Sequence, residues 1–368
     1  MTPLPFPHLR SRIRTGARRL RPLALVGLLL APAGFPGQPP LAGIHNPWLR
    51  VDWDAATGRI QIRSRAESNR LVAELEAPGA ETGGQPRLET AAGPLGWEQR
   101  LIVRQTDGPA AILSLPRDWP FLLLRRRLTP AVQPAGPPAT TPVVSSARLH
   151  FPRPPEQLRA LGTGGLKPLA EAPGSYVFLA IADPASRSGM VAAWLTHHRG
   201  CGVLFPSVTD GTPGFQARIE YGRLPIPEGE TTESEVLAVG WFADVREGLE
   251  RYADAVARAE HIVLPPQLEG YCTWYSRPHG GASDAPHLLE LARFAARELG
   301  PFGLDFIQID DGWQEGRRRN GPAKVFGRTK PGGPYPDGIR PVADQLAELG
   351  LITGLWWMPF AGDRQDPF

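Results

Sequence analysis

The sequence feature that most restricts the fold is the stretch 304–314, LDFIQIDDGWQ, in which an apolar run meets two acids and a glycine. The apolar part predicts a strand covered on both faces, as in a parallel sheet. Asp310 and Asp311 at the end of such a strand repel each other and are costly to desolvate, so a fold keeps them where water, cations or ligand hydroxyls compensate. In a parallel α/β barrel the carboxyl ends of the strands form the active-site face. The stretch therefore predicts a barrel strand that carries two acids to a binding site.

A turn is the alternative interpretation of Asp310-Asp311-Gly312, with an aspartate capping a following helix and glycine in a left-handed conformation. Trp313, however, follows directly. Carboxylates accept hydrogen bonds from hydroxyls in pairs, and an aromatic face takes the apolar face of a pyranose ring. An apolar strand, two acids, a glycine and an indole are thus the parts of a sugar subsite.

Three runs of the sequence resemble the melibiase-type α-galactosidases of glycoside hydrolase family 36, clan D, and the related raffinose synthases of plants. Residues 309–314, IDDGWQ, are similar to the most recognisable run of that family. Residues 270–274, GYCTW, resemble its tryptophan-bearing first barrel strand, and residues 354–357, GLWW, resemble its third strand. The resemblance implies a sandwich domain followed by a barrel, a substrate with a terminal α-galactoside, and no cofactor.

The resemblance also implies roles for individual side chains. Asp310 and Asp311 would hold the galactose 4- and 6-hydroxyls, and Trp274 would line the same pocket. Trp313 and Trp357 are further candidates for substrate contact. For all three indoles the alternative is ordinary packing in the barrel core, because large aromatic residues usually pack.

Neither aspartate suits the bond-breaking step. Retaining glycosidases place two carboxyl groups on either side of the glycosidic bond, whereas neighbours on one strand project differently and cannot flank a bond. No residue of the chain matches the family's nucleophile or its acid/base, and Met358-Pro359-Phe360 stands where many members have Glu-Pro-Glu. The expected catalytic set within this chain is therefore empty.

Residues 1–33 are expected to be a signal peptide. The apolar run 23–30 is too short to span a bilayer, and Ala31-Pro32-Ala33 provides the small residues of a cleavage site. The protein is thus expected to be secreted or periplasmic, and Arg18-Arg19 also permits a twin-arginine signal. A disordered basic arm that binds nucleic acid is the alternative.

The basic excess of the chain lies in this same segment. The whole chain has 40 Lys plus Arg against 37 Asp plus Glu, a formal charge of +3. Without the six arginines of the first 21 residues the balance is 34 against 37, a formal charge of −3. Nothing then indicates a nucleic-acid partner, and no later run approaches membrane length.

The two cysteines, Cys201 and Cys272, are interpreted as two buried thiols, because Cys272 falls within a predicted core strand. A disulfide formed after export, which would join the two domains, is the alternative. Adjacent His197 and His198 would point to opposite faces of a strand, which argues against a metal site.

Residues 34–264 predict a large antiparallel β-sandwich domain. Residues 49–53 and 60–62 alternate apolar and polar side chains around a turn, which predicts a hairpin. Further strands are expected at 101–104, 121–124, 147–151, 176–181, 190–196, 202–205, 217–221 and 235–239. Residues 77–86 and 131–142 are expected to be exposed loops. A helix over 242–260 closes the domain, with one apolar face made by Val245, Leu249, Tyr252, Ala253 and Val256.

Residues 265–368 predict the first three βα units of an incomplete (β/α)8 TIM barrel. Strands are expected at 270–276, 304–309 and 352–358, with helices at 285–299, capped by Ser283 or Asp284, and at 341–349. A complete barrel takes roughly 250 residues, whereas 103 residues remain from 266 to 368. Truncation is favoured, because an open three-stranded piece leaves an exposed edge. The alternative is that the missing strands are supplied in another way.

Three functions fit these observations. The first is a retaining hydrolase of terminal α-D-galactosides, cut off before its nucleophile. The second is α-galactosyl transfer, since the Cys-Thr-Trp of raffinose synthases is similar to Cys272-Thr273-Trp274. The third is an inactive carbohydrate-binding relative. In each case the partner is an α-galactoside oligosaccharide or glycan, and the chain alone is expected not to hydrolyse an aryl α-galactoside.

Overall fold

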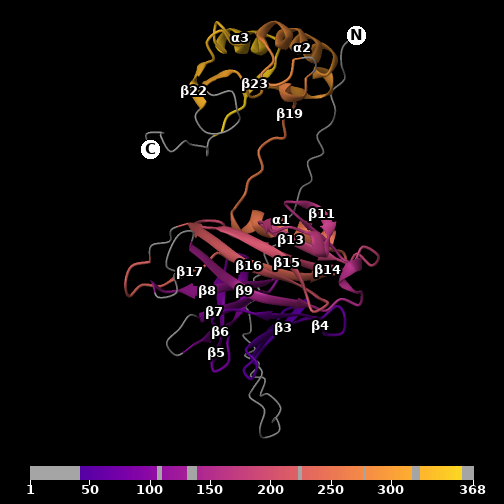
Figure 1. Cartoon of the computed structure of the whole chain (residues 1–368), viewed down its shortest axis with the longest axis vertical. Coiled ribbons are helices and arrows are strands. Elements are labelled where there is room, and N and C mark those ends of the chain that lie inside the picture. Colours follow the sequence, from indigo (N-terminus) through magenta and orange to yellow (C-terminus); the bar gives the residue numbers. More distant parts are fainter. Residues whose placement is uncertain are drawn as a thin grey trace, which may run out of the picture. The chain divides into compact units, whose positions relative to one another are not determined.

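The fold was analysed in a computed structural model, which describes residues 42–105, 110–130, 139–222, 226–276, 279–316 and 324–358. The predicted signal peptide lies outside these residues. The chain divides into two compact units, of which the first ends at Ile262 and the second begins at Val263. Each unit is described by itself, and both are drawn in Figure 1.

The first unit consists of two antiparallel sheets, in keeping with the predicted sandwich. One sheet orders β1 (Ala42–His45), β2 (Leu49–Asp54), β3 (Arg59–Ser64), β4 (Arg70–Glu76), β9 (Ala139–Leu149), β16 (Thr212–Gly222), β15 (Cys201–Thr209) and β12 (Ser175–Tyr176). The other orders β11 (Gly165–Pro168), β10 (Arg159–Gly162), β13 (Phe178–Ala182), β14 (Gly189–Trp194), β18 (Leu237–Phe242), β8 (Leu122–Leu128), β7 (Ala110–Pro116), β6 (Gly96–Arg104) and β5 (Gln85–Gly93), with β17 (Thr232–Glu233) paired to β8. Short 3-10 turns lie at η2 (Pro155–Gln157) and η3 (Leu169–Glu171).

The core of this unit lies between the sheets. Trp53 and Ile60 of the first sheet belong to the same buried cluster as Leu113 and Val239 of the second. Strand β3 alternates buried and partly exposed residues, as expected where one face meets the core and the other meets solvent. The predicted hairpin over 49–62 is confirmed, since β2 and β3 pair in register.

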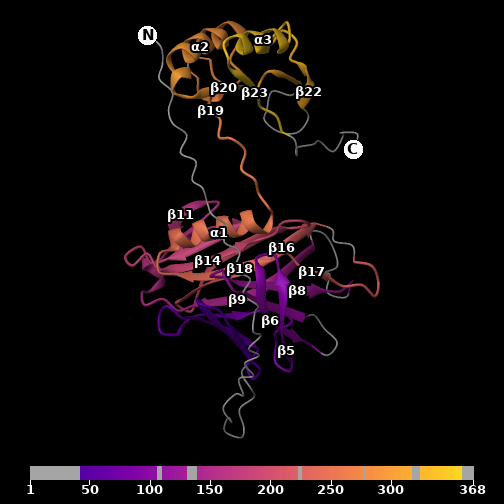
Figure 2. The same ribbon diagram turned by 180° about the vertical axis from the view of Figure 1, so that it is seen from behind.

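Three strands of the second sheet, β7, β14 and β18, are buried at every position. Helix α1 (Val245–Ala259) covers the outer face at β14 and β18 (Figure 2), where Tyr252 and Ala255 pack with Val191 and Ala238. The predicted closing helix is therefore confirmed. Its predicted face was wrong at Ala253, which is exposed because the buried stripe passes through Ala255 instead.

Two further sequence predictions need correction in this unit. Residues 139–142, expected to belong to a loop, begin strand β9, because β16 pairs with them; residues 131–138 lie outside the described chain. Cys201, expected to be buried, is an exposed free thiol. Gly202 next to it faces Trp194 in the core, so the pleat turns Cys201 to the outside.

The second unit contains a parallel sheet in the order β19 (Glu269–Cys272), β20 (Leu304–Ile309), β23 (Ile352–Leu355). Helix α2 (Ala285–Glu298) connects the first two strands, and helix α3 (Arg340–Glu348) precedes β23. Asp284 caps α2, which ends before the turn η5 (Gly300–Phe302). The alternation of parallel strands and helices was predicted correctly, whereas a barrel is not shown by the described residues.

The boundaries of the predicted strands were wrong at two places. Strand one was expected to reach residue 276, but β19 ends at Cys272 and the turn η4 (Thr273–Tyr275) follows, because the Ser276 N–H bonds the Thr273 carbonyl within the turn instead of a neighbouring strand. Strand three was expected to reach residue 358, but β23 ends at Leu355. A hairpin of β21 (Gln314–Gly316) and β22 (Lys324–Thr329) was not predicted. Residues 317–319 between them, an arginine run, lie outside the described chain.

None of the described helices is both long enough and apolar enough to cross a membrane.

Candidate functional site

The candidate site is an open cavity of about 270 Å³ in the second unit, where the parallel strands end. It is lined by Cys272, Trp274, Tyr275, Asp310, Asp311 and Trp356. Cys272 is the last residue of β19, and Trp274 and Tyr275 follow it; the two aspartates follow β20, and Trp356 follows β23. Because parallel strands end at one edge of a sheet, residues far apart in the sequence meet there. Three of the predicted site residues, Asp310, Asp311 and Trp274, are thus brought together.

Asp310 is held in one orientation by its neighbours. Its backbone N–H donates to the Thr273 hydroxyl at 3.0 Å. Its Oδ2 accepts from the Cys272 thiol at 3.1 Å and from Gln308 Nε2 at 2.9 Å. Its Oδ1 accepts from the backbone N–H of Asp311 at 2.8 Å. These donors stabilise a carboxylate that is only 7% exposed.

Asp311 is supported by the residues that follow it. Gln314 Nε2 donates to Asp311 Oδ1 at 2.6 Å, and Gln314 Oε1 accepts from the backbone N–H of Gly312 at 3.0 Å. Gly312 has φ +115°, a conformation that a residue with a side chain rarely adopts. The turn considered in the sequence analysis is therefore present. It leads into β21 and not into a helix, so the aspartates cap no helix.

The Cys272 thiol is a hydrogen-bond donor in this site. Burial raises the pKa of Cys272, and the hydrogen bond to Asp310 raises it further. The thiol consequently stays protonated at neutral pH and donates to the carboxylate, while a thiolate beside Asp310 would add like-charge repulsion. Cys272 is partly exposed and unpaired, so the expectation of free thiols holds for both cysteines, although neither is fully buried.

Trp313 and Trp357 lie outside this cavity. Trp313 is 4% exposed and packs in the core of the second unit, where its indole N–H donates to the Trp356 carbonyl at 3.0 Å. It lines a neighbouring cavity of about 550 Å³ together with Phe326 and Ile339. Trp357 is 60% exposed and meets the Phe326 ring edge-on at 6.4 Å. Substrate contact by these two indoles therefore stays a prediction.

Sequence reasoning missed Trp356, Tyr275 and the supporting glutamines. Trp356 and Trp357 are adjacent, so they project in different directions from the end of β23, and only the register of the sheet decides which one faces the cavity. That register places the Trp356 N–H against the Ile309 carbonyl at 2.9 Å. The role of Gln314 could have been predicted from its position three residues after Asp311, because this spacing suits a side-chain hydrogen bond across a turn.

No protein-family model matches the chain, and no curated protein matches it in sequence. Among solved structures, the chain is similar to an alpha-N-acetylgalactosaminidase, NagBb, from Bifidobacterium bifidum. Its GalNAc complex matches with a TM-score of 0.49 and 14% identity over 85% of this chain and 58% of that chain. The ligand-free form matches with a TM-score of 0.48 and 12% identity over 89% and 61%, respectively. This chain therefore spans about 60% of the length of these glycosidases.

Proposed function

We propose that the second unit binds the terminal galactose of an α-D-galactoside, as the sugar-binding part of a melibiase-type glycoside hydrolase. The observation that carries the proposal is the meeting of Asp310, Asp311, Trp274 and Trp356 in one open cavity at the ends of three parallel strands. Two carboxylates and two indoles from separate strands provide the acceptors and the apolar faces that a pyranose requires.

The proposed roles follow from the chemistry of each group. The carboxylates accept hydrogen bonds from the 4- and 6-hydroxyls of galactose, and charge-assisted bonds of this kind are among the strongest that a protein makes. An axial 4-hydroxyl reaches these acceptors, whereas the equatorial hydroxyl of glucose would leave a buried acceptor unpaired. The indole faces of Trp274 and Trp356 cover the apolar side of the ring.

The proposal assigns Asp310 and Asp311 to binding and not to bond cleavage. Retention needs two carboxyl groups about 5–5.5 Å apart on opposite sides of the anomeric carbon. Among the described residues that line the cavity, the only carboxylates are these two, which are consecutive residues directly after β20. We therefore expect no hydrolysis of an aryl α-galactoside by the 368-residue chain alone.

Calorimetric titration of the full chain with melibiose tests the proposal. Asp311→Asn keeps the shape of the side chain and removes its charge, so affinity should fall about tenfold or more. Asp344→Asn is the matched control, because Asp344 is an exposed helix residue paired with Arg340. Maltose, which ends in glucose, should bind at least about tenfold more weakly than melibiose. Equal affinity for both sugars, or an unchanged affinity in Asp311→Asn, would contradict the proposal.

Transfer of galactose to another sugar is the second candidate. It is favoured by the Cys272-Thr273-Trp274 run, whose thiol lies in the cavity 3.1 Å from Asp310 Oδ2. Product analysis with water or a sugar as acceptor separates the two reactions, provided that the residues completing the catalytic pair are present. Binding without either product would identify a carbohydrate-binding relative.

We further propose that the protein is exported. The support is the arginine-rich segment 1–33 with its short apolar run. Amino-terminal sequencing of the protein from the medium or periplasm should find a mature chain beginning near residue 34.

A further inference from the structure

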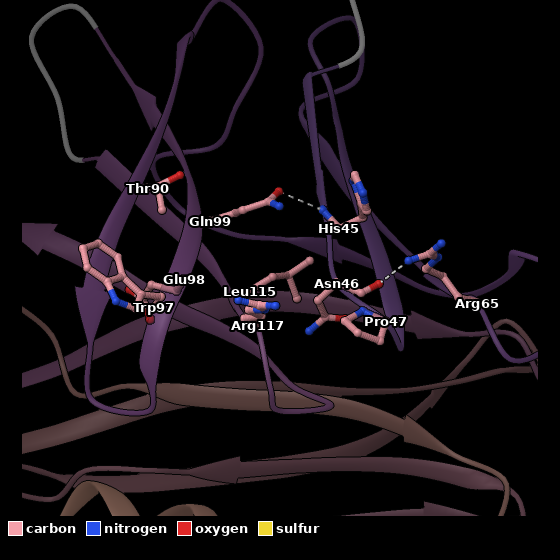
Figure 3. A pocket seen from close by; sticks show the side chains of 10 residues that line it. All are labelled: His45, Asn46, Pro47, Arg65, Thr90, Trp97, Glu98, Gln99, Leu115 and Arg117. Atoms are coloured by element: carbon pink, nitrogen blue, oxygen red, sulfur yellow. Dashed lines mark hydrogen bonds between the residues drawn. The ribbon is translucent and has the colours of Figure 1, made fainter. Parts of the chain in front are cut away.

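The sandwich has a groove of its own, with a volume of about 480 Å³. His45 and Arg65 reach it from the β1–β3 side of the first sheet, while Trp97, Gln99 and Arg117 reach it from the β5–β7 side of the second (Figure 3). All of these residues belong to the first unit. The groove is therefore independent of the cavity at Asp310 and Asp311.

The two walls of the groove are fastened to each other. Asn46, which is buried, donates through Nδ2 to the carbonyls of Pro116 and Trp119, at 2.9 Å each. Gln99 Oε1 accepts from the backbone N–H of His45 at 3.3 Å, a bond drawn in Figure 3. A groove held in this way is formed before a ligand arrives, which lowers the entropic cost of binding.

An exposed indole forms part of one wall. Trp97 is 66% exposed near the tip of the β5–β6 hairpin, and it belongs to none of the buried clusters among the described residues. Single exposed aromatic side chains are common on protein surfaces, but this one lines a groove that also carries two arginines. Its flat apolar face can receive a sugar ring.

The charge of the groove is positive. Arg65 donates through Nη1 to the Asn46 carbonyl at 2.6 Å, and its other donors face solvent or the groove. Among the described residues, no hydrogen bond or ion pair is found for the Arg117 side chain, which is exposed. Glu98 is the one acid in the lining of the described chain, and its carboxylate pairs with Arg100 at 2.6 Å and Arg125 at 2.9 Å. Both pairs are made by Oε1, while the buried Oε2 has no hydrogen-bond partner among the described residues, so the lining carries two guanidinium groups against one partly paired acid.

We propose that this groove binds an acidic oligosaccharide, with a sugar ring on Trp97 and a carboxylate on Arg117. A guanidinium is a planar fork that matches a carboxylate, and the free amide N–H groups of Gln99 can donate to hydroxyl oxygens. An acidic peptide would satisfy the arginines but would not require a flat indole beside them. The saccharide accounts for both features of the groove.

The test is a titration of the full chain with a linear trimer of α-1,4-linked galacturonic acid, followed by calorimetry and tryptophan fluorescence. Trp97→Ala and Arg117→Ala should each weaken binding about tenfold or more. Both side chains are exposed, so the fold should be retained, and unchanged melting temperatures check this. Trp48→Ala and Arg87→Ala are matched controls, because these exposed side chains lie outside the groove lining.

Three results would overturn the inference. The first is that neutral galactotriose binds as tightly as the galacturonic acid trimer, and the second is that a short polyglutamate peptide does so. The third is that the trimer still binds with unchanged affinity after both Trp97→Ala and Arg117→Ala. Binding that disappears in Asp311→Asn would also overturn it, because the trimer would then occupy the other cavity. The groove substitutions should change melibiose affinity by less than about twofold, since the groove and the galactoside cavity share no lining residue. Failure of the galactoside proposal is thus distinguishable from failure of this one.

Discussion

The two units bury their strands to different extents. In the sandwich unit, β7, β14 and β18 are covered at every position, by the facing sheet on one side and partly by α1 on the other. In the second unit, β19 and β23 have no fully buried residue, and Ile352, Leu355 and Trp357 are exposed. Helices α2 and α3 pack on one face of the parallel sheet, as the core cluster shows. The first unit therefore has a closed core, while in the second the outer strands stay partly exposed and the polar groups of the cavity lie at the carboxyl ends of the strands.

This contrast suggests that the sandwich core contributes most to folding stability, while the galactoside cavity lies in the unit with the more open sheet.

The largest effect is expected for Leu113→Ala in the sandwich core. Leu113 is fully buried in the cluster between the two sheets, so the substitution should cost about 2–5 kcal/mol in the free energy of unfolding. Leu355→Ala in the second unit removes a half-exposed side chain and should cost about 0.5 kcal/mol or less. Urea denaturation followed by tryptophan fluorescence measures both. A similar loss of unfolding free energy for the two substitutions would contradict the contrast between the units. Under conditions in which Leu113→Ala is folded, its affinity for melibiose should be unchanged.

A smaller effect is expected for Thr273→Val. The hydroxyl accepts from the Asp310 N–H and donates to the Gly281 carbonyl, so valine leaves one buried and one partly buried backbone group unpaired. The cost should be about 1–3 kcal/mol in the second unit. Melibiose affinity should fall as well, because Asp310 loses its anchor. Thr353→Val is the control, since no side-chain hydrogen bond of Thr353 is found among the described residues. An equal effect of both substitutions would show that the two hydrogen bonds of the Thr273 hydroxyl contribute little to stability.

The smallest effect is a change in the rate of thiol alkylation. In a Cys201→Ser background, iodoacetamide should modify Cys272 more slowly at pH 7–8 than it modifies an ordinary cysteine, because a raised pKa leaves less thiolate. The rate should rise as the pH passes the raised pKa. Asp310→Asn removes the like charge, lowers the pKa of Cys272 and should speed the reaction at the same pH. Melibiose should slow the alkylation of Cys272 further. If Cys272 reacts as fast as an ordinary cysteine, or if Asp310→Asn leaves its rate unchanged, the hydrogen bond between Cys272 and Asp310 is contradicted.

Much of the local structure was predictable because it depends on short-range pattern. The alternation over residues 49–62 predicts a hairpin in any context where one face is buried, and β2 and β3 form it. A cap by Ser283 or Asp284 similarly predicts α2 to within one residue, and Asp284 is the residue that caps it. The second unit's order of strand, helix and strand follows from the same signals.

Long-range pairing decided the features that were missed. Residues 139–142 read as a loop by composition, yet they belong to β9 because β16 lies beside them. The cavity at Asp310 was predictable in part, since the acids and Trp274 were recognised, whereas Cys272 as a donor to Asp310 depends on the pairing of β19 with β20.

The amino-acid sequence alone thus determined the hairpin over residues 49–62, the strand-helix alternation of the second unit, where the paired acids end a strand and which chemistry they suit. Only the tertiary structure decided that Trp356 and not Trp357 faces the cavity, and that two walls from different sheets form a second groove around Trp97. The physical reason is that side-chain periodicity is a local property of the backbone, while strand register is a relation between distant segments. A shift of one residue in that register moves every side chain of a strand to the opposite face.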